Sequence, residues 1–86
     1  PSLISFVAIS KRRKEILIKL KERSMSQPEL KKLTGMYKGH TSRTLKELSE
    51  KNLIVCINQQ DRAFRFYKIT NLGKRVIEEL QRILKE

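Results

Sequence analysis

SQPELKKLTGMYKGHTSRTLKELSEKNLI, residues 26–54, joins a short helical pattern to a longer one through a glycine, and it ends where a β-branched run begins. In the first pattern, the Ser26 side chain can accept a hydrogen bond from the backbone N–H of Glu29, and the Glu29 side chain can return one. Gly35 can adopt the positive φ with which a helix ends. We therefore predict a helix between these two caps, over residues 26–34.

The second pattern has a core-facing side and a polar side. Thr41, Leu45 and Leu48 recur at spacings of four and three, which places them on one side of a helix that faces a core. We predict this helix over residues 38–51, starting either at Lys38 or later, with Thr41 as its cap. The outward side carries five polar residues: His40, Ser42, Arg43, Lys46 and Glu47. An outward face of this kind suits a DNA groove.

The charge of the chain is large, positive and unevenly spread. The 86 residues carry a formal net charge of +11. Residues 10–51 hold 13 Lys and Arg against 5 Glu, whereas residues 71–86 hold 4 basic and 3 acidic residues. Such an excess indicates a polyanionic partner, most often nucleic acid, and a merely soluble basic protein is the alternative. A glycine-broken helix pair in so basic a chain suggests a helix-turn-helix.

The start of the chain is apolar and then basic. Residues 1–9, PSLISFVAI, can pack on the core of this domain or on a second subunit, and the small size of the domain favours the second subunit. We predict a helix over residues 10–23 with Ser10 as its N-cap. Its first turn carries Lys11, Arg12, Arg13 and Lys14, where positive charge opposes the helix dipole. The cluster indicates a phosphate contact, a solvated face, or a helix that starts earlier, near Ser2.

A hairpin is predicted over residues 53–69. The apolar run LIVCI is followed by a polar turn, NQQDR, and by the alternating segment AFRFYKI. Arg62 would lie at the tip of the hairpin, with Arg65 one strand step further in. In this register Phe64 and Phe66 share one strand face, which we expect to point into the core.

The last segment is predicted to be a helix over residues 71–85. Its apolar positions are Leu72, Val76, Ile77, Leu80, Ile83 and Leu84. Six such positions in thirteen residues make a stripe wider than one core contact requires. One edge can therefore bury against the helix at residues 10–23 while the other edge meets a partner, and a fully buried terminal helix is the alternative.

No catalytic or metal-binding set of residues is recognisable. Cys56 is the sole cysteine and His40 the sole histidine, so a disulfide within the chain and a Cys/His zinc set are excluded. Cys56 falls in a predicted strand, and we expect an inert core residue there rather than a redox sensor. Glu78 and Glu79 are adjacent and point about 100° apart on a helix, which makes a poor acid and base pair. We predict no enzyme activity, no metal and no cofactor.

Nothing in the sequence indicates a membrane. No apolar run reaches the roughly 18 residues needed to span a bilayer. Residues 3–9 lack the flanking features of a signal peptide. We therefore expect a cytoplasmic protein. The first residue is Pro1 rather than methionine, which is compatible with further residues upstream.

The order of these segments resembles that of the prokaryotic and archaeal winged helix-turn-helix regulators of the MarR and ArsR type. Three passages carry the resemblance: SQPELKKLTGMYKGHTSRTLKELSEKNLI, INQQDRAFRFYKIT and ITNLGKRVIEEL. They correspond to the paired helices, the wing and the start of the last helix, and the likeness covers roughly residues 10–80. It implies a mostly α-helical fold with a small β-hairpin, that is, a three-helix core, a two- or three-stranded wing and a C-terminal helix.

The resemblance also implies which residues would contact DNA. The recognition-helix contacts fall on Lys38, Gly39, His40, Ser42, Arg43 and Lys46. A phosphate contact at the start of the helix at residues 26–34 falls on Ser26 and Gln27, with backbone N–H groups that we expect to be free. MarR proteins usually show Asp, any residue, then Arg in the wing, whereas Asp61 is followed directly by Arg62, so Arg62 and Arg65 compete for this role. The metal-binding cysteine pattern of the ArsR type is absent.

We therefore predict a single domain that binds double-stranded DNA sequence-specifically as a transcriptional regulator. The recognition helix would lie in the major groove and the wing on the minor groove or backbone. We expect a homodimer formed through residues 1–9, the helix at 10–23 and the C-terminal helix. Two alternatives stay open: a protein-interaction module, and an RNA-binding winged helix. Exposed aromatic side chains at Tyr37, Phe64, Phe66 or Tyr67 would favour the RNA-binding alternative.

Overall fold

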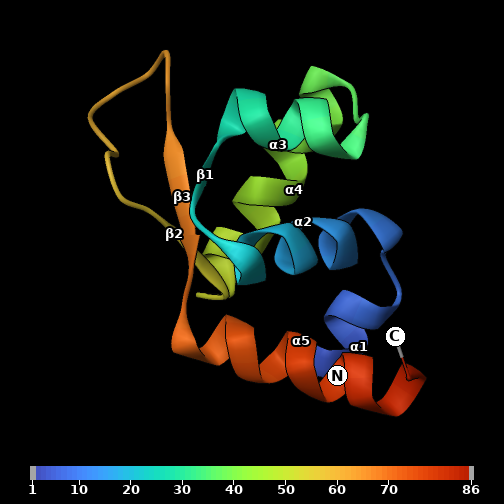
Figure 1. Cartoon of the computed structure of the whole chain (residues 1–86). Helices are drawn as coiled ribbons and strands as arrows, with labels where there is room; N and C mark the ends of the chain where they lie inside the picture. The colour runs from blue at the N-terminus through green and yellow to red at the C-terminus, as the bar shows by residue number, and fades with distance from the viewer. Residues whose placement is uncertain (1, 86) are drawn as a thin grey trace.

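Five helices and three strands make up the part of the chain that the computed structural model describes, residues 2–85 (Figure 1). In chain order they are α1 (Leu3–Ala8), α2 (Lys11–Glu22), β1 (Met25–Ser26), α3 (Gln27–Thr34), α4 (Lys38–Glu50), β2 (Ile54–Cys56), β3 (Phe66–Ile69) and α5 (Asn71–Leu84). This mostly helical architecture with a small antiparallel sheet confirms the predicted winged helix-turn-helix. None of the described helices is both long and apolar enough to cross a membrane.

The wing is a three-stranded sheet with β3 in the middle. β1 and β2 both pair with β3 in antiparallel fashion, with Met25 opposite Tyr67 and Ile54 opposite Ile69. Because β1 leads directly into α3, the sheet fixes the start of the helix pair to the base of the wing.

The core lies around α2, which Figure 1 shows between α4 on one side and α5 on the other. Ile16 and Leu17 of α2 are fully buried. The core-facing stripe predicted for the recognition helix is confirmed, since Thr41, Leu45 and Leu48 are each at most 1% exposed. With this side of α4 buried, its polar side is turned outward.

The turn between α3 and α4 forms largely as its residues predict. The Ser26 side chain accepts from the Glu29 backbone N–H at 3.2 Å, and Gly35 ends α3 with φ 71°. α4 begins at Lys38. The later start at Thr41 is wrong, because the Thr41 hydroxyl donates to the Tyr37 carbonyl at 3.0 Å instead of capping the helix.

The apolar N-terminal segment forms a helix that packs on this domain. Val7 of α1 is fully buried, and α1 lies against α2 and α5. The expectation that this segment packs on a second subunit is therefore wrong for Val7, which packs on the core of its own domain. A continuous helix from Ser2 is also wrong: Ser10 caps α2 separately, accepting from the Arg13 N–H at 3.2 Å. An apolar surface persists at Ile9, Ile83 and Leu84, which are 80%, 57% and 45% exposed.

The hairpin tip differs from the prediction. β2 ends at Cys56 and β3 begins at Phe66, so residues 57–65 form a longer loop. Asp61 Oδ1 accepts from the backbone N–H groups of Ala63 and Phe64, which pulls both residues out of the strand. Phe64 is consequently 52% exposed, and the expectation that it points into the core is wrong.

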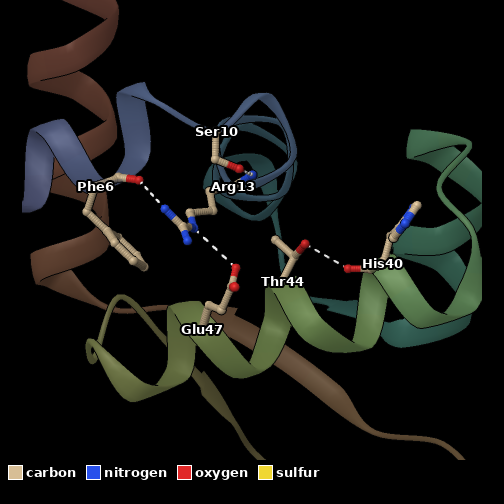
Figure 2. A network of polar contacts seen from close by, with 6 residues as sticks. All are labelled: Phe6, Ser10, Arg13, His40, Thr44 and Glu47. Carbon is tan, nitrogen blue, oxygen red and sulfur yellow. Dashed lines mark hydrogen bonds and ion pairs between the residues drawn. The ribbon is translucent and has the colours of Figure 1, made fainter.

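Arg13 connects three helices (Figure 2). Its guanidinium donates to the Phe6 carbonyl near the end of α1 at 2.7 Å and to the Glu47 carboxylate of α4 at 3.2 Å. The same group lies 3.8 Å from the centroid of the Phe6 ring, which adds a cation–π contact. The Arg13 side chain is only 17% exposed. Of the basic cluster, Arg13 therefore has a structural role, and its guanidinium is not free to contact a phosphate.

Gly73, near the start of α5, is required by close packing. A Cβ atom at this position would lie 2.1 Å from the Leu53 carbonyl oxygen, whereas nothing lies within 4 Å of the same position at Gly39 of α4. We expect Gly73→Ala to lower the free energy of unfolding by roughly 1–3 kcal/mol through overpacking. Gly39→Ala should raise it by about 0.4–1 kcal/mol, because alanine restricts the unfolded chain. Urea titration of both variants checks this, and a neutral Gly73→Ala would contradict the packing described.

The Arg13 contacts predict a stability difference between neighbouring arginines. Arg13→Ala should lower the free energy of unfolding by roughly 1–3 kcal/mol, since it leaves the Phe6 carbonyl and the Glu47 carboxylate without their donor. Arg12→Ala is the matched control, because Arg12 is exposed on the same turn, and its effect should stay within about 0.5 kcal/mol. Equal effects in thermal or urea unfolding would contradict a structural role for Arg13.

Candidate nucleic-acid interface

A concave surface runs between α4, the start of α3 and the wing. Its polar lining includes Gln27, Lys38, Ser42, Lys46, Arg62 and Arg65. All of these belong to the set predicted from the sequence, and the structure brings them into one groove. We call this surface the wing groove.

The recognition helix presents its predicted residues on two adjacent stripes. Lys38, Ser42 and Lys46 follow one another at spacings of four, so they share one stripe that lines the wing groove. Gly39 and Arg43 are exposed beside this stripe, outside the groove lining. The helix therefore offers one row toward the wing and a second row, with Arg43, directly to the outside.

Two residues of the predicted outward face are less exposed than expected. His40 is half-buried, and its ring lies 5.7 Å from that of Tyr37. Glu47 was also placed on this face, which is wrong, because its carboxylate pairs with Arg13 on α2 (Figure 2). This pairing removes a negative charge from the outward surface of α4.

The start of α3 is not the free set of N–H groups that was expected. Ser26 is only 4% exposed, and the Gln27 N–H donates to the Arg65 carbonyl at 2.8 Å. A phosphate contact through the Gln27 backbone is thus wrong. The Gln27 side chain is instead engaged across the groove, with its Nε2 donating to Ser42 Oγ at 2.7 Å.

Both candidate arginines of the wing lie along the groove. Arg62 and Arg65 are exposed and line it together, so the structure does not select one of them over the other. The Arg65 Nε also donates to the Asp61 carbonyl at 3.3 Å, and the Asn58 side chain donates to the Phe64 carbonyl at 2.8 Å. These bonds fix the loop that carries the two arginines.

Two residues at the far end of the groove are absent from the set predicted from the sequence. Ser49 and Glu50 of α4 line the groove beyond Lys46. The signal was present, because Glu50 continues the spacing of four that relates Lys38, Ser42 and Lys46. Cys56 also borders the groove, half-buried, with its Sγ donating to Asn58 Oδ1 at 3.4 Å.

The basic residues divide into paired and unpaired groups. Outside the groove, Arg13 pairs with Glu47, Arg23 with Glu29, Lys21 with Glu78, Lys11 with Glu15 and Arg82 with Glu79. No acidic partner within the described residues pairs with the groove cations Lys38, Lys46, Arg62 and Arg65, nor with Arg43 beside them. The cations in and beside the wing groove are therefore uncompensated within the described residues, as are exposed cations elsewhere, such as Lys31, Lys32 and Arg75.

The acidic residue of α3 closest to its start is already neutralised. The Arg23 guanidinium donates to the Glu29 carboxylate and lowers the pKa of Glu29, and a backbone hydrogen bond from Ser26 acts in the same direction. Within residues 2–85, no cluster of three or more His, Cys, Asp or Glu side chains could hold a metal ion. The chemistry of the groove is therefore that of fixed cations and hydrogen-bonding groups.

Comparison with known structures supports the fold assignment. The chain is similar to a MarR mutant from E. coli complexed with operator DNA, with 22% identity over 94% of this chain and 59% of that chain, and a TM-score of 0.79. A MepR mutant from S. aureus bound to an oligodeoxyribonucleotide gives 20% identity over 95% and 62%, and a TM-score of 0.80. HlyU from Vibrio cholerae gives 22% identity over 98% and 95%, and a TM-score of 0.75.

The chain thus spans about three fifths of the MarR and MepR chains and nearly all of HlyU. A comparison with curated proteins finds no match. The model of the family described as the HVO_A0261 N-terminal domain matches residues 1–86. The chain therefore belongs to the HVO_A0261 N-terminal domain family, and its fold is the winged helix of the MarR-type regulators.

Proposed function

We propose that this chain is the DNA-binding domain of a transcriptional regulator that recognises a specific double-stranded sequence. The observation that carries the proposal is the line of cations without acidic partners along the wing groove, Lys38, Lys46, Arg62 and Arg65. A regular row of phosphates is the polyanion that a groove of this kind fits. A regulator of this kind would act in the cytoplasm and would not be an enzyme.

In the proposed complex α4 lies in the major groove. Arg43, on its outermost row, is free to make a bidentate contact to guanine, and Ser42 reaches a base edge from the row beside it. Lys38 and Lys46 neutralise phosphates and set the register. His40, half-buried against Tyr37, makes a weaker contact near the start of the helix.

The wing completes the interface. Arg62 and Arg65 follow the backbone or enter the minor groove, and Lys31 and Lys32 of α3 are exposed for further phosphates. Two of the similar structures are complexes with DNA: the MarR mutant with operator DNA and the MepR mutant with an oligodeoxyribonucleotide. At 22% and 20% identity, this likeness shows the fold alone. DNA binding by this chain is therefore part of the proposal.

A two-fold dimer is part of the proposal. Its surface would include three exposed apolar side chains: Ile9, directly after α1, and Ile83 and Leu84, at the end of α5. In such a dimer the two recognition helices meet half-sites about 34 Å apart. The binding site would then be a palindrome.

RNA is the second candidate ligand, because two aromatic side chains are exposed. Tyr37 is 77% exposed and Phe64 is 52% exposed, and exposed aromatic rings stack on unpaired bases. A mobility-shift assay with duplex DNA, duplex RNA and single strands separates the two ligands. Preference for single-stranded RNA, lost in Phe64→Ala, would favour this candidate over duplex DNA.

The cation row predicts the salt response of DNA binding. If 6–10 phosphates are neutralised per dimer, the logarithm of the affinity should fall with the logarithm of the salt concentration with a slope of roughly −5 to −9. Lys46→Ala should weaken all duplexes alike and reduce the magnitude of the slope by about 2, because each protomer of the dimer loses one phosphate contact. Arg43→Ala should cost about 1–3 kcal/mol on the selected site only.

Arg75→Ala is the matched control for these two variants. Arg75 is an exposed arginine on α5, and its removal should leave the affinity and the slope unchanged. Fluorescence anisotropy with a site selected from random duplexes measures both quantities. A nearly flat salt response of the wild-type chain would overturn the proposed function.

A further inference from the structure

Gln27 is bonded to both elements of the proposed DNA interface. Its backbone N–H donates to the carbonyl of Arg65, next to β3 of the wing, at 2.8 Å. Its side-chain Nε2 donates to Ser42 Oγ of the recognition helix at 2.7 Å. Gln27 is the first residue of α3, and its side chain and that of Ser42 both line the wing groove. Gln27 therefore connects the wing to α4.

The bond from Gln27 also decides the direction of the Ser42 proton. Helical hydroxyl groups often donate to the carbonyl four residues earlier. On α4, Thr41 does so to Tyr37 at 3.0 Å, and Thr44 to His40 at 2.7 Å (Figure 2). Ser42 instead accepts from Gln27, and within residues 2–85 its hydroxyl has no acceptor of its own.

The pair thus places free donors beside a free acceptor. The donors are the Ser42 O–H and the second N–H of the Gln27 amide, and the acceptor is the Gln27 Oε1, whose position is set by the bond from Nε2 to Ser42. A base with an acceptor opposite Oε1, as guanine has, would meet a like group there. In the major groove adenine presents one acceptor, N7, and one donor, N6. Guanine presents two acceptors there, and cytosine presents a donor alone.

We propose that Gln27 is a positioning and specificity-determining residue, and that Gln27 and Ser42 together read adenine in the major groove. This inference rests on the proposed function, since it names the base that the wing groove selects. The Gln27 amide holds the Ser42 oxygen and keeps the serine a donor. Lys38 and Lys46 beside the pair supply affinity through phosphates, whereas the pair selects the base at its own position.

Gln27→Glu tests the inference by reversing the hydrogen bond. A carboxylate only accepts, so Ser42 must turn its proton toward it, and the groove then presents acceptors alone. Acceptors match the N4 group of cytosine. A negative charge at the first position of a helix is favourable, so the variant should fold. We expect the ratio of affinities for adenine over cytosine at one position of the site to fall by roughly threefold to tenfold.

The controls separate this effect from added charge. Gln81→Glu places the same charge on α5, outside the groove lining, and should leave the base preference unchanged. In a Ser42→Ala background, Gln27→Glu should no longer move the preference, because the hydroxyl that it reorients is gone. Site selection from random duplexes followed by competition binding measures all five chains: the wild type, Gln27→Glu, Gln81→Glu, Ser42→Ala and the double variant.

A second measurement needs no DNA. The side-chain amide protons of Gln27 should shift in the NMR spectrum of the free Ser42→Ala protein. Ser49→Ala, which removes another hydroxyl of the groove lining, should leave them in place. Unshifted Gln27 resonances in Ser42→Ala would overturn the pair itself.

The outcomes distinguish the inference from the proposed function. A wild-type chain that selects duplexes with adenine, and a Gln27→Glu variant that moves toward cytosine, support both. Selection of duplexes with the same preference in both chains overturns the inference and leaves DNA binding intact. A wild-type chain that selects no duplex overturns the proposed function, and the reading of adenine with it.

Discussion

The burial of one side of α4 is the constraint on which the rest of the molecule depends. Thr41, Leu45 and Leu48 are at most 1% exposed, so the rotation of the helix about its axis is fixed. A rotation large enough to turn Lys38 and Lys46 inward would bring these side chains into water and cost about 1.5–3 kcal/mol for each leucine. The burial of the apolar row therefore determines the direction in which the polar rows of the helix face. Arg13 adds a second restraint, because it holds Glu47 against α2.

The sequence predicts the elements that local chemistry determines. Ser26 and Gly35 bound α3 because a side-chain cap and a positive φ act within a few residues. The hairpin tip escaped prediction for the opposite reason. The alternating pattern suggested a strand through Phe64, but the backbone N–H of Phe64 donates to the Asp61 side chain instead of to a neighbouring strand. A pattern of apolar residues does not show which backbone group a nearby carboxylate will capture.

The candidate site was predictable in its members and not in its connections. Lys38, Ser42 and Lys46 were each predicted as site residues, and helix geometry, which makes residues at a spacing of four neighbours, explains why they form one stripe in the structure. The bond between Gln27 and Ser42 joins residues fifteen positions apart on different helices. Only the packing of α3 on α4 brings them together, and the sequence of neither helix alone predicts that packing. The same holds for Arg13 and Glu47, which are 34 positions apart.

The division of charges shows how a very basic domain remains compact. Five cations outside the groove, Arg13 and Arg23 among them, lie next to carboxylates, so their repulsion is offset within the fold. Those around the groove have no such partner among the described residues, and bringing them together raises the energy of the free protein. A bound polyanion relieves this repulsion for any base sequence. Discrimination between sequences must therefore come from groups that reach base edges in a fixed orientation, and within the groove Gln27 and Ser42 are bonded in such an orientation.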